Sequence, residues 1–495
     1  MIINTLIKAM RIPFYCLGFL LFGQPALFGQ ALRDVPYYST DEASARQKLA
    51  DETAASIRSK FQAPEKLDKE AKKAYLERRD HIAENVAAEI NQMAIPDDAL
   101  WPFLKHTHAV IIAANPECAA TKIILTSSPV PNAFSVGDGT IVVYTGLLAG
   151  LENEDQLAFV LCHEIAHFLL EHSTKGLVKE INTYYSKEFK DKVKAANQVE
   201  FNRNEQLESI YKNVLFNSRY HHRDLERQAD SLAYRLFLKT PYAPTQAQRL
   251  IQLFEYIDEP LRDSTLQLDT HFGSTQYPFQ QHWLEKSQGS VWGETKILQS
   301  AAEKTLQDSL STHPDWQNRL HWIEALAQSS SPDVSKIATP ENRYTAIKYL
   351  STIESVESWF NHGRYDKSLY YAMQYQSVYP ECAYFNEIEA LSLYRLYTHS
   401  KDHDLASVLS KRSPDHSEKY NQFLDFLNNL RLKDLLALRN WSLSTLGASK
   451  TEYGLLAAYC IAEAQEDRSS MIKLKREYLS TYRNGRFVEF FKTKI

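Results

Sequence analysis

The chain has 495 residues, of which 44% are hydrophobic, 24% charged and 12% aromatic, a balance that excludes intrinsic disorder and allows two or three domains. Only 15 residues are glycine and 18 are proline, and so few turn-formers exclude sandwiches, propellers and collagen-like repeats. The formal net charge of −5 gives no reason to expect general attraction to nucleic acid or to an anionic membrane.

The first segment, residues 1–31, has the pattern of a secretory signal peptide. Lys8 and Arg11 precede an apolar stretch over residues 12–28, and residues 29–31 offer small side chains at a cleavage site. No later run reaches about 18 uninterrupted apolar residues, so we expect no transmembrane helix in the mature chain. The expected location is a periplasm or another extracytoplasmic space, soluble or peripherally associated. The alternatives are an uncleaved anchor and an N-terminus that is apolar by chance.

Residues 32–330 are expected to form one domain in which helices surround a small sheet. The apolar spacing over residues 40–93 is near 3.6 and predicts two helices broken near Pro64. Residues 258–311 mix polar and aromatic side chains and indicate a long surface insertion. Later helices are expected over three segments: 154–172, a charged stretch to about 216, and 224–238. Short strands are expected over three apolar runs between turn signals: 109–112, 122–125 and 140–144.

The C-terminal part of the chain predicts a second domain. Residues 331–340 contain two prolines and indicate a linker, and residues 341–495 are almost entirely amphipathic helix. Glycine, leucine, alanine and proline over residues 363–380 follow the spacing of a tetratricopeptide repeat. The predicted fold class is therefore α+β, mostly α, followed by an all-α helical-repeat domain that recruits substrate or partner proteins.

Residues 163–167 read H-E-I-A-H and match the H-E-x-x-H pattern of zinc hydrolases. Histidines four positions apart on a helix project about 40° from one another, so His163 and His167 can reach one metal ion. Glu164 can take a proton from metal-bound water, whose pKa the metal lowers toward about 7. The alternative is a helix in which the two histidines bind no metal.

A catalytic zinc needs a third protein ligand and an open position. Glu226, 59 residues after the second histidine, is the best candidate. Asp230 lies four positions further on the same helical face, so one carboxylate can bind the metal while the other receives an imidazole N–H. His172 follows His163 by nine positions, which places it on the opposite face of a continuous helix. His222 stays open as another ligand.

Further motifs flank the H-E-x-x-H helix. Residues 131–136 and 139–148 precede it, and residues 312–314 (T-H-P) with Arg319 follow it. In this order, across about residues 95–326, the motifs resemble the HtpX/CAAX-prenyl-protease/Oma family of zinc metallopeptidases. The resemblance implies a gluzincin-type domain, mostly helical with a small sheet.

This resemblance also implies roles for single residues. It implies one zinc per chain bound through His163, His167 and Glu226, with Glu164 as general base. It implies that Asp230 supports a ligand histidine.

The resemblance further implies where a substrate lies. A strand before the metal helix would lie along the cleft, where an extended peptide pairs with it. His313 and Arg319 would lie near the developing oxyanion. His313 could instead close the open zinc position and hold the enzyme inactive, and plain packing is a third reading. The residues of the substrate-binding strand are Asn132, Ala133, Phe134 and Ser135.

The sequence lacks the internal transmembrane helices of the membrane-embedded members of this family. It therefore resembles the soluble exported branch of BepA-type proteases, in which tetratricopeptide-like repeats follow the peptidase domain. We expect an exported zinc endopeptidase that hydrolyses protein substrates in envelope quality control. The alternative is a helical-repeat chaperone or assembly factor with a latent or structural zinc site.

Overall fold

The computed structural model divides the described chain into two compact units, and each is described by itself. The first unit takes residues 43–257 and 316–347, and the helical unit takes residues 259–286 and 348–493. Among the described residues, no helix is both long and apolar enough to cross a membrane. The structure describes residues 43–96, 100–197, 223–257, 259, 267–274, 277–286, 316–330, 333, 335–339, 341–413, 416–446, 449–483, 485 and 487–493.

The first unit begins with a helical hairpin. Helices α3 (Ala43–Lys60) and α4 (Lys69–Met93) pack against each other, which confirms the two helices predicted on either side of Pro64. Asp68 caps α4 by accepting the Ala71 N–H at 2.8 Å. The hairpin's apolar face packs against one face of the sheet that follows in the chain.

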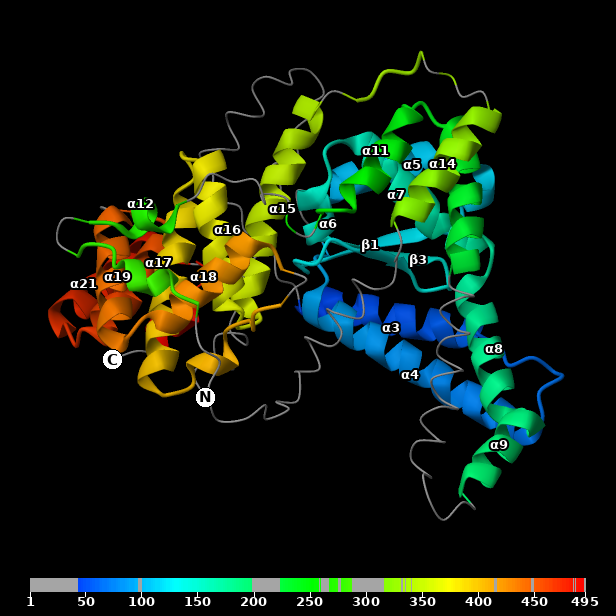
Figure 1. Ribbon diagram of the computed structural model, residues 1–495, viewed down its shortest axis with the longest axis horizontal. Helices are drawn as coiled ribbons and strands as arrows, with labels where there is room; N and C mark the ends of the chain where they lie inside the picture. Colours follow the sequence, from blue (N-terminus) through cyan, green and yellow to red (C-terminus); the bar gives the residue numbers. More distant parts are fainter. Residues whose placement is uncertain are drawn as a thin grey trace. The chain divides into compact units, whose positions relative to one another are not determined.

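A three-stranded sheet forms the middle layer of this unit (Figure 1). Its strands β1 (Lys122–Thr126), β2 (Ala133–Ser135) and β3 (Thr140–Tyr144) lie in the order β1-β3-β2. Strand β3 is parallel to β1 and antiparallel to β2, and all its residues are buried, as expected for a central strand. Two of the three predicted strands are thereby confirmed, and β2 is left with one unpaired edge among the described strands.

The strand predicted over residues 109–112 is wrong, because this run lies in helix α5 (Trp101–Ala114). Trp101, Leu104 and Ile111 are buried along one face of α5, at the spacing of a helix. Four apolar residues alone do not separate a strand from a buried helix, and the longer period decides here.

Helix α7 (Glu154–Leu169) carries the H-E-x-x-H residues and is buried over most of its length. The Asn153 side chain caps it by accepting the Gln156 N–H at 3.0 Å. Helices α5 and α7 lie on the side of the sheet opposite the α3–α4 hairpin (Figure 1). Residues 223–239 are helical as predicted. The other helices of the unit are α6 (Thr145–Gly150), α8 (His172–Tyr185), α9 (Lys187–Asn197), α11 (Thr245–Leu253) and α14 (Trp316–Ser330).

The unbroken helix predicted over residues 154–172 is wrong at its end. Helix α7 stops at Leu169, and Glu171 adopts a left-handed conformation with φ 58° before α8 begins at His172. A left-handed residue ends a helix because it turns the chain away from the helix axis.

The helical unit consists only of helices and connecting turns among its described residues. Consecutive helices pack in pairs, α16 on α17 and α20 on α21, and Gly363 with φ 73° makes the turn before α16. A regular tetratricopeptide array stays a prediction. The helices are α12 (Leu268–Phe272), α15 (Glu341–Asn361), α16 (Tyr365–Val378), α17 (Ala383–Lys401), α18 (Glu418–Asn429), α19 (Leu432–Leu446), α20 (Glu452–Ala464), α21 (Arg468–Thr481) and α22 (Val488–Thr493), with short 3₁₀ turns η2 (Gln281–Leu284) and η3 (Leu405–Ser407).

The described parts of the 258–311 insertion belong to the helical unit. Phe272 stacks on Phe426 with ring centroids 5.2 Å apart, and Trp283 is completely buried in the same aromatic cluster. The Asn429 side chain donates to the Trp283 carbonyl oxygen at 3.1 Å. The insertion therefore packs on helices more than a hundred residues later in the chain, although we expected it within the peptidase domain.

The expected linker at 331–340 attaches to the first unit where it is described. The Thr339 N–H donates to Asp155 at 3.1 Å, and Lys336 Nζ donates to the Leu238 and Thr240 carbonyl oxygens at 2.9 and 2.7 Å. The two units divide later, inside α15.

A substitution at Trp283 tests this assignment. Trp283→Ala removes a fully buried ring, so we expect the free energy of unfolding of the helical unit to fall by about 3–5 kcal/mol. Gln281→Ala, on the exposed side of the same turn, is the control and leaves it unchanged. Urea titrations followed by circular dichroism measure both. A Trp283→Ala protein as stable as the control contradicts the assignment.

Candidate metal centre

Three residues predicted as metal ligands come together in the first unit. His163 Nε2 lies 3.1 Å from His167 Nε2, and Glu226 oxygens lie 3.4 Å from each of these nitrogens. One ligand atom from each residue lies within 4.8 Å of the other two, as in a metal-binding cluster. His163 and His167 come from successive turns of α7, and Glu226 comes from helix 223–239. His167 and Glu226 are 59 residues apart in the sequence, and tertiary packing of the two helices brings them together.

The cluster is buried, with one side nearer to solvent. Side-chain exposure is 5% for His163 and 4% for Glu226, but 14% for His167. Glu164 follows His163 on the same helix and is 3% exposed. A carboxylate beside two imidazoles in a buried site is the arrangement that general-base chemistry at a metal requires.

A buried ion pair lies behind His163. The His163 Nδ1 atom lies 2.9 Å from Asp230 Oδ1, and Arg319 grips the same carboxylate through Nη2 at 2.8 Å and Nε at 3.0 Å. Such a fork-shaped contact fixes the carboxylate's orientation as well as its charge. Asp230 thereby holds the His163 ring with Nε2 toward the cluster.

These contacts shift the pKa values of His163 and Asp230. Burial and the charge of Arg319 act to lower the pKa of His163, but the carboxylates of Asp230 and Glu226 outweigh them and raise it to about 9. Burial acts to raise the pKa of Asp230, but Arg319 and His163 hold it well below its ordinary value. A metal ion that binds at Nε2 of His163 must therefore displace a proton.

His172 lies against the other ligand histidine, His167, contrary to the expectation that it faces away from the ligands. Its Nδ1 atom is 3.0 Å from Nδ1 of His167, and the two rings meet edge to face with centroids 4.9 Å apart. The placement on an opposite helix face assumed a continuous helix, and the break at Glu171 removes that assumption. Burial, followed by the charge of His167, lowers the pKa of His172 to about 4.

Of the remaining predicted site residues, the structure describes some and leaves others outside the described residues. Arg319 is 3% exposed and is bound to Asp230, and its Nη1 atom lies 3.8 Å from Glu226 Oε2. Its role near the developing oxyanion stays a prediction. His222 and His313 lie outside the described residues. Residues 133–135 form β2, and Asn132 precedes it with its carbonyl oxygen accepting the Tyr144 N–H at 3.0 Å.

Comparison with known proteins finds a family match over the part of the chain that carries this site. The model of peptidase family M48 matches residues 105–327, a range that holds α7, helix 223–239 and Arg319. This segment belongs to peptidase family M48. The M48 domain thus contains the metal cluster, the sheet and the ion pair behind the cluster.

Three relatives match a shorter part of the chain. The mitochondrial metalloendopeptidase OMA1 of Arabidopsis thaliana is 30% identical over 77 residues, which is 16% of each chain. The mitochondrial metalloendopeptidases OMA1 of Bos taurus and Homo sapiens are 34% and 32% identical over 90 residues, which is 17% of each chain. The chain thus spans no more than 17% of the length of these relatives.

The unpaired edge of β2 in the M48 domain presents backbone hydrogen-bonding groups. Bonds from the Val136 N–H to the Thr140 oxygen and from the Tyr144 N–H to the Asn132 oxygen alternate along the β2–β3 ladder. Because successive residues of an antiparallel strand face opposite edges, the backbone groups of Ala133 and Ser135 point to the open edge. Ser173 Oγ donates to the Ser135 carbonyl oxygen at 3.4 Å, so this oxygen already has a partner and the open edge ends there.

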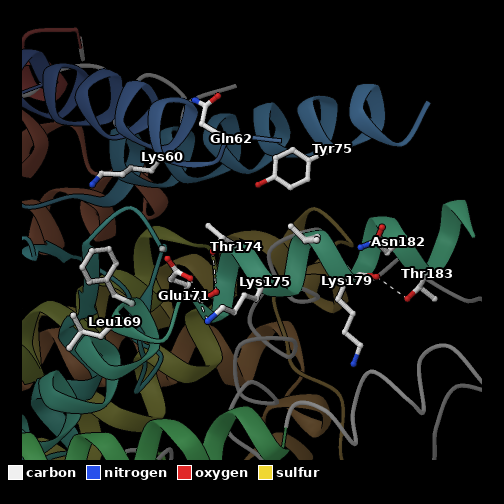
Figure 2. Close-up of a pocket in the computed structure, with 13 residues that line it drawn as sticks. Lys60, Gln62, Tyr75, Leu169, Glu171, Thr174, Lys175, Lys179, Asn182 and Thr183 are labelled. Atoms are coloured by element: carbon white, nitrogen blue, oxygen red, sulfur yellow. Dashed lines mark hydrogen bonds and ion pairs between the residues drawn. The ribbon is translucent and has the colours of Figure 1, made fainter. Parts of the chain in front are cut away.

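A cavity of about 850 Å³ lies beside the M48 domain's metal helix, between α8 and the α3–α4 hairpin (Figure 2). Phe168 and Leu169 at the end of α7 line it, together with residues of α8 such as Lys175 and Asn182. None of the three clustered ligands lines it, so it is separate from the metal centre.

A substitution at Asp230 tests the support behind His163. Asp230→Asn removes the charge that Arg319 and His163 share, so we expect metal affinity to fall about 10–100-fold. The free energy of unfolding is expected to fall by about 3 kcal/mol, because the Arg319 charge stays buried without its partner. Chelator competition and urea titration measure the two effects. Asp224→Asn, exposed on the same helix, is the control, and equal metal affinity in both variants contradicts the role.

Proposed function

We propose that the chain is a zinc-dependent endopeptidase. The observation that carries this proposal is the close approach of the three side chains. The two Nε2 atoms lie 3.1 Å apart, and a Glu226 carboxylate oxygen lies 3.4 Å from each of them, Oε2 from His163 and Oε1 from His167. Ligand atoms in a tetrahedral zinc site with bonds of about 2.0–2.1 Å lie about 3.3 Å apart. Two imidazole nitrogens and one carboxylate also form a donor set typical of catalytic zinc, which leaves one position for water or substrate.

Zinc at this site would supply a Lewis acid that polarises the scissile carbonyl and acidifies water. Glu164 takes the proton from the attacking water and then delivers it to the nitrogen of the leaving amine. Asp230 keeps the His163 ring oriented during both steps, because Arg319 holds the carboxylate in place.

The open edge of β2 offers a place for the substrate backbone. An extended peptide that adds a strand there would bond to the outward N–H and C=O groups of Ala133 and to the outward N–H of Ser135. Main-chain pairing of this kind binds a peptide without demanding one side chain, which suits an enzyme that acts on protein substrates.

Export and a role in envelope quality control form part of the proposal. The signal-like pattern of residues 1–31 supports export. The helical unit supports recruitment of substrate or partner proteins, since packed helical hairpins commonly present extended binding surfaces.

A variant without the general base distinguishes the peptidase proposal from the chaperone alternative. Glu164→Gln keeps the size of the side chain but cannot take a proton, so we expect cleavage of a labelled unfolded protein to slow by about 10²–10⁴-fold. Zinc content should stay at the wild-type value. Glu84→Gln, exposed on α4, is the control for activity. If Glu164→Gln cleaves the labelled protein at the wild-type rate, the peptidase proposal fails and the chaperone alternative is favoured.

Elemental analysis tests the third ligand. We expect one zinc per chain in the wild-type protein and a marked loss in Glu226→Gln, because a neutral amide oxygen binds zinc more weakly than a carboxylate does. The Glu164→Gln protein, which keeps all three ligands, is the matched control. Full zinc occupancy in the Glu226→Gln protein moves the third ligand elsewhere.

A further inference from the structure

The two ligand histidines need partners on their second ring nitrogens. A histidine that binds a metal through Nε2 keeps its proton on Nδ1 and is oriented by the group that accepts this proton. For His163 this group is Asp230, at 2.9 Å. For His167 the structure places the Nδ1 atom of His172 at 3.0 Å, within hydrogen-bond distance.

We propose that His172 is a positioning residue for His167. Two ring nitrogens at this distance need one donor and one acceptor, so the Nδ1–H of His167 donates and the unprotonated Nδ1 of His172 accepts. His172 then carries its own proton on Nε2. This hydrogen bond holds the His167 ring with Nε2 toward Glu226, 3.4 Å away. The inference rests on the metal site of the proposed function, and not on catalysis by it.

The break between α7 and α8 makes this contact possible. On a continuous helix a residue five positions after His167 would project about 140° away from it. The left-handed Glu171 turns the chain back, so that the first residue of α8 meets the last turn of α7. His172 is 5% exposed and packs edge to face on the His167 ring, which leaves little room for it to swing away.

Several hydrogen bonds hold this turn in place. The Glu171 N–H donates to the Phe168 carbonyl oxygen at 2.9 Å. The Glu171 carbonyl oxygen accepts Thr174 Oγ1 at 3.0 Å and the Lys175 N–H at 2.9 Å, and Lys175 Nζ reaches the Leu170 carbonyl oxygen at 2.9 Å. Figure 2 shows Thr174 and Lys175 turned toward Glu171 from the first turns of α8. Hydrogen bonds to the end of α7 and to the first turn of α8 thus both hold the turn that places His172.

Zinc affinity of the full chain tests the inference directly. Metal-free wild-type, His172→Asn and His172→Leu proteins are titrated with zinc against a chromophoric chelator. We expect His172→Leu to bind zinc about 10–100-fold more weakly, because it cannot accept the His167 proton. His172→Asn should stay within a few-fold of wild type, because its amide oxygen can accept in place of Nδ1. His81→Asn, exposed on α4, is the control.

A second readout separates positioning from packing. The visible spectrum of the cobalt-loaded protein reports ligand geometry, and we expect it to change in His172→Leu but not in His172→Asn. Circular dichroism of the metal-free variants checks that both are folded. Wild-type zinc affinity in His172→Leu overturns the inference, as does an equal loss in two folded variants. Zinc binding with the expected pattern but no proteolysis supports it while the proposed function fails, and no zinc binding by the wild-type chain overturns both.

Discussion

The buried pair between Asp230 and Arg319 joins parts of the M48 domain that are far apart in the chain. Asp230 lies on helix 223–239, Arg319 on α14, and the carboxylate between them receives the ring of His163 on α7. Burying two charges is costly and is offset only by close, well-aligned contacts, which the two-pronged grip of Arg319 supplies. Because the orientation of a metal ligand depends on this pair, the site requires the whole tertiary arrangement and not α7 alone.

Much of the fold could be predicted because it follows the local spacing of apolar residues along the chain. The α3–α4 hairpin follows the 3.6-residue spacing of its apolar side chains, and the central strand β3 is a short apolar run between turn residues. The H-E-x-x-H spacing predicted that His163 and His167 lie on one helical face, and the structure places their Nε2 atoms 3.1 Å apart. Glu226 could be chosen because an acidic pair at helical spacing has few other reasons to follow such a motif.

The rest could not be predicted because it depends on contacts between distant residues or on one dihedral angle. Residues 109–112 look like a strand by composition, and only packing of the whole of α5 decides for a helix. Glutamate has no preference for the left-handed region, so Glu171 gives no sequence signal for the break that follows α7. A histidine within a few residues of H-E-x-x-H was visible as a signal, but His172 could be placed against His167 only once that break was known.

The two ligand histidines have different partners, Asp230 for His163 and His172 for His167, and this difference affects the net charge around the site. Asp230 brings a negative charge to His163, and Arg319 balances it, so this pair adds no net charge behind the site. A neutral His172 adds none behind His167. The charge that faces a metal ion is therefore set by Glu226 among the ligands, with Glu164 beside them. A second carboxylate behind His167 would lack a cation of its own, and its uncompensated burial would cost stability. A neutral acceptor avoids that cost and still fixes the ring.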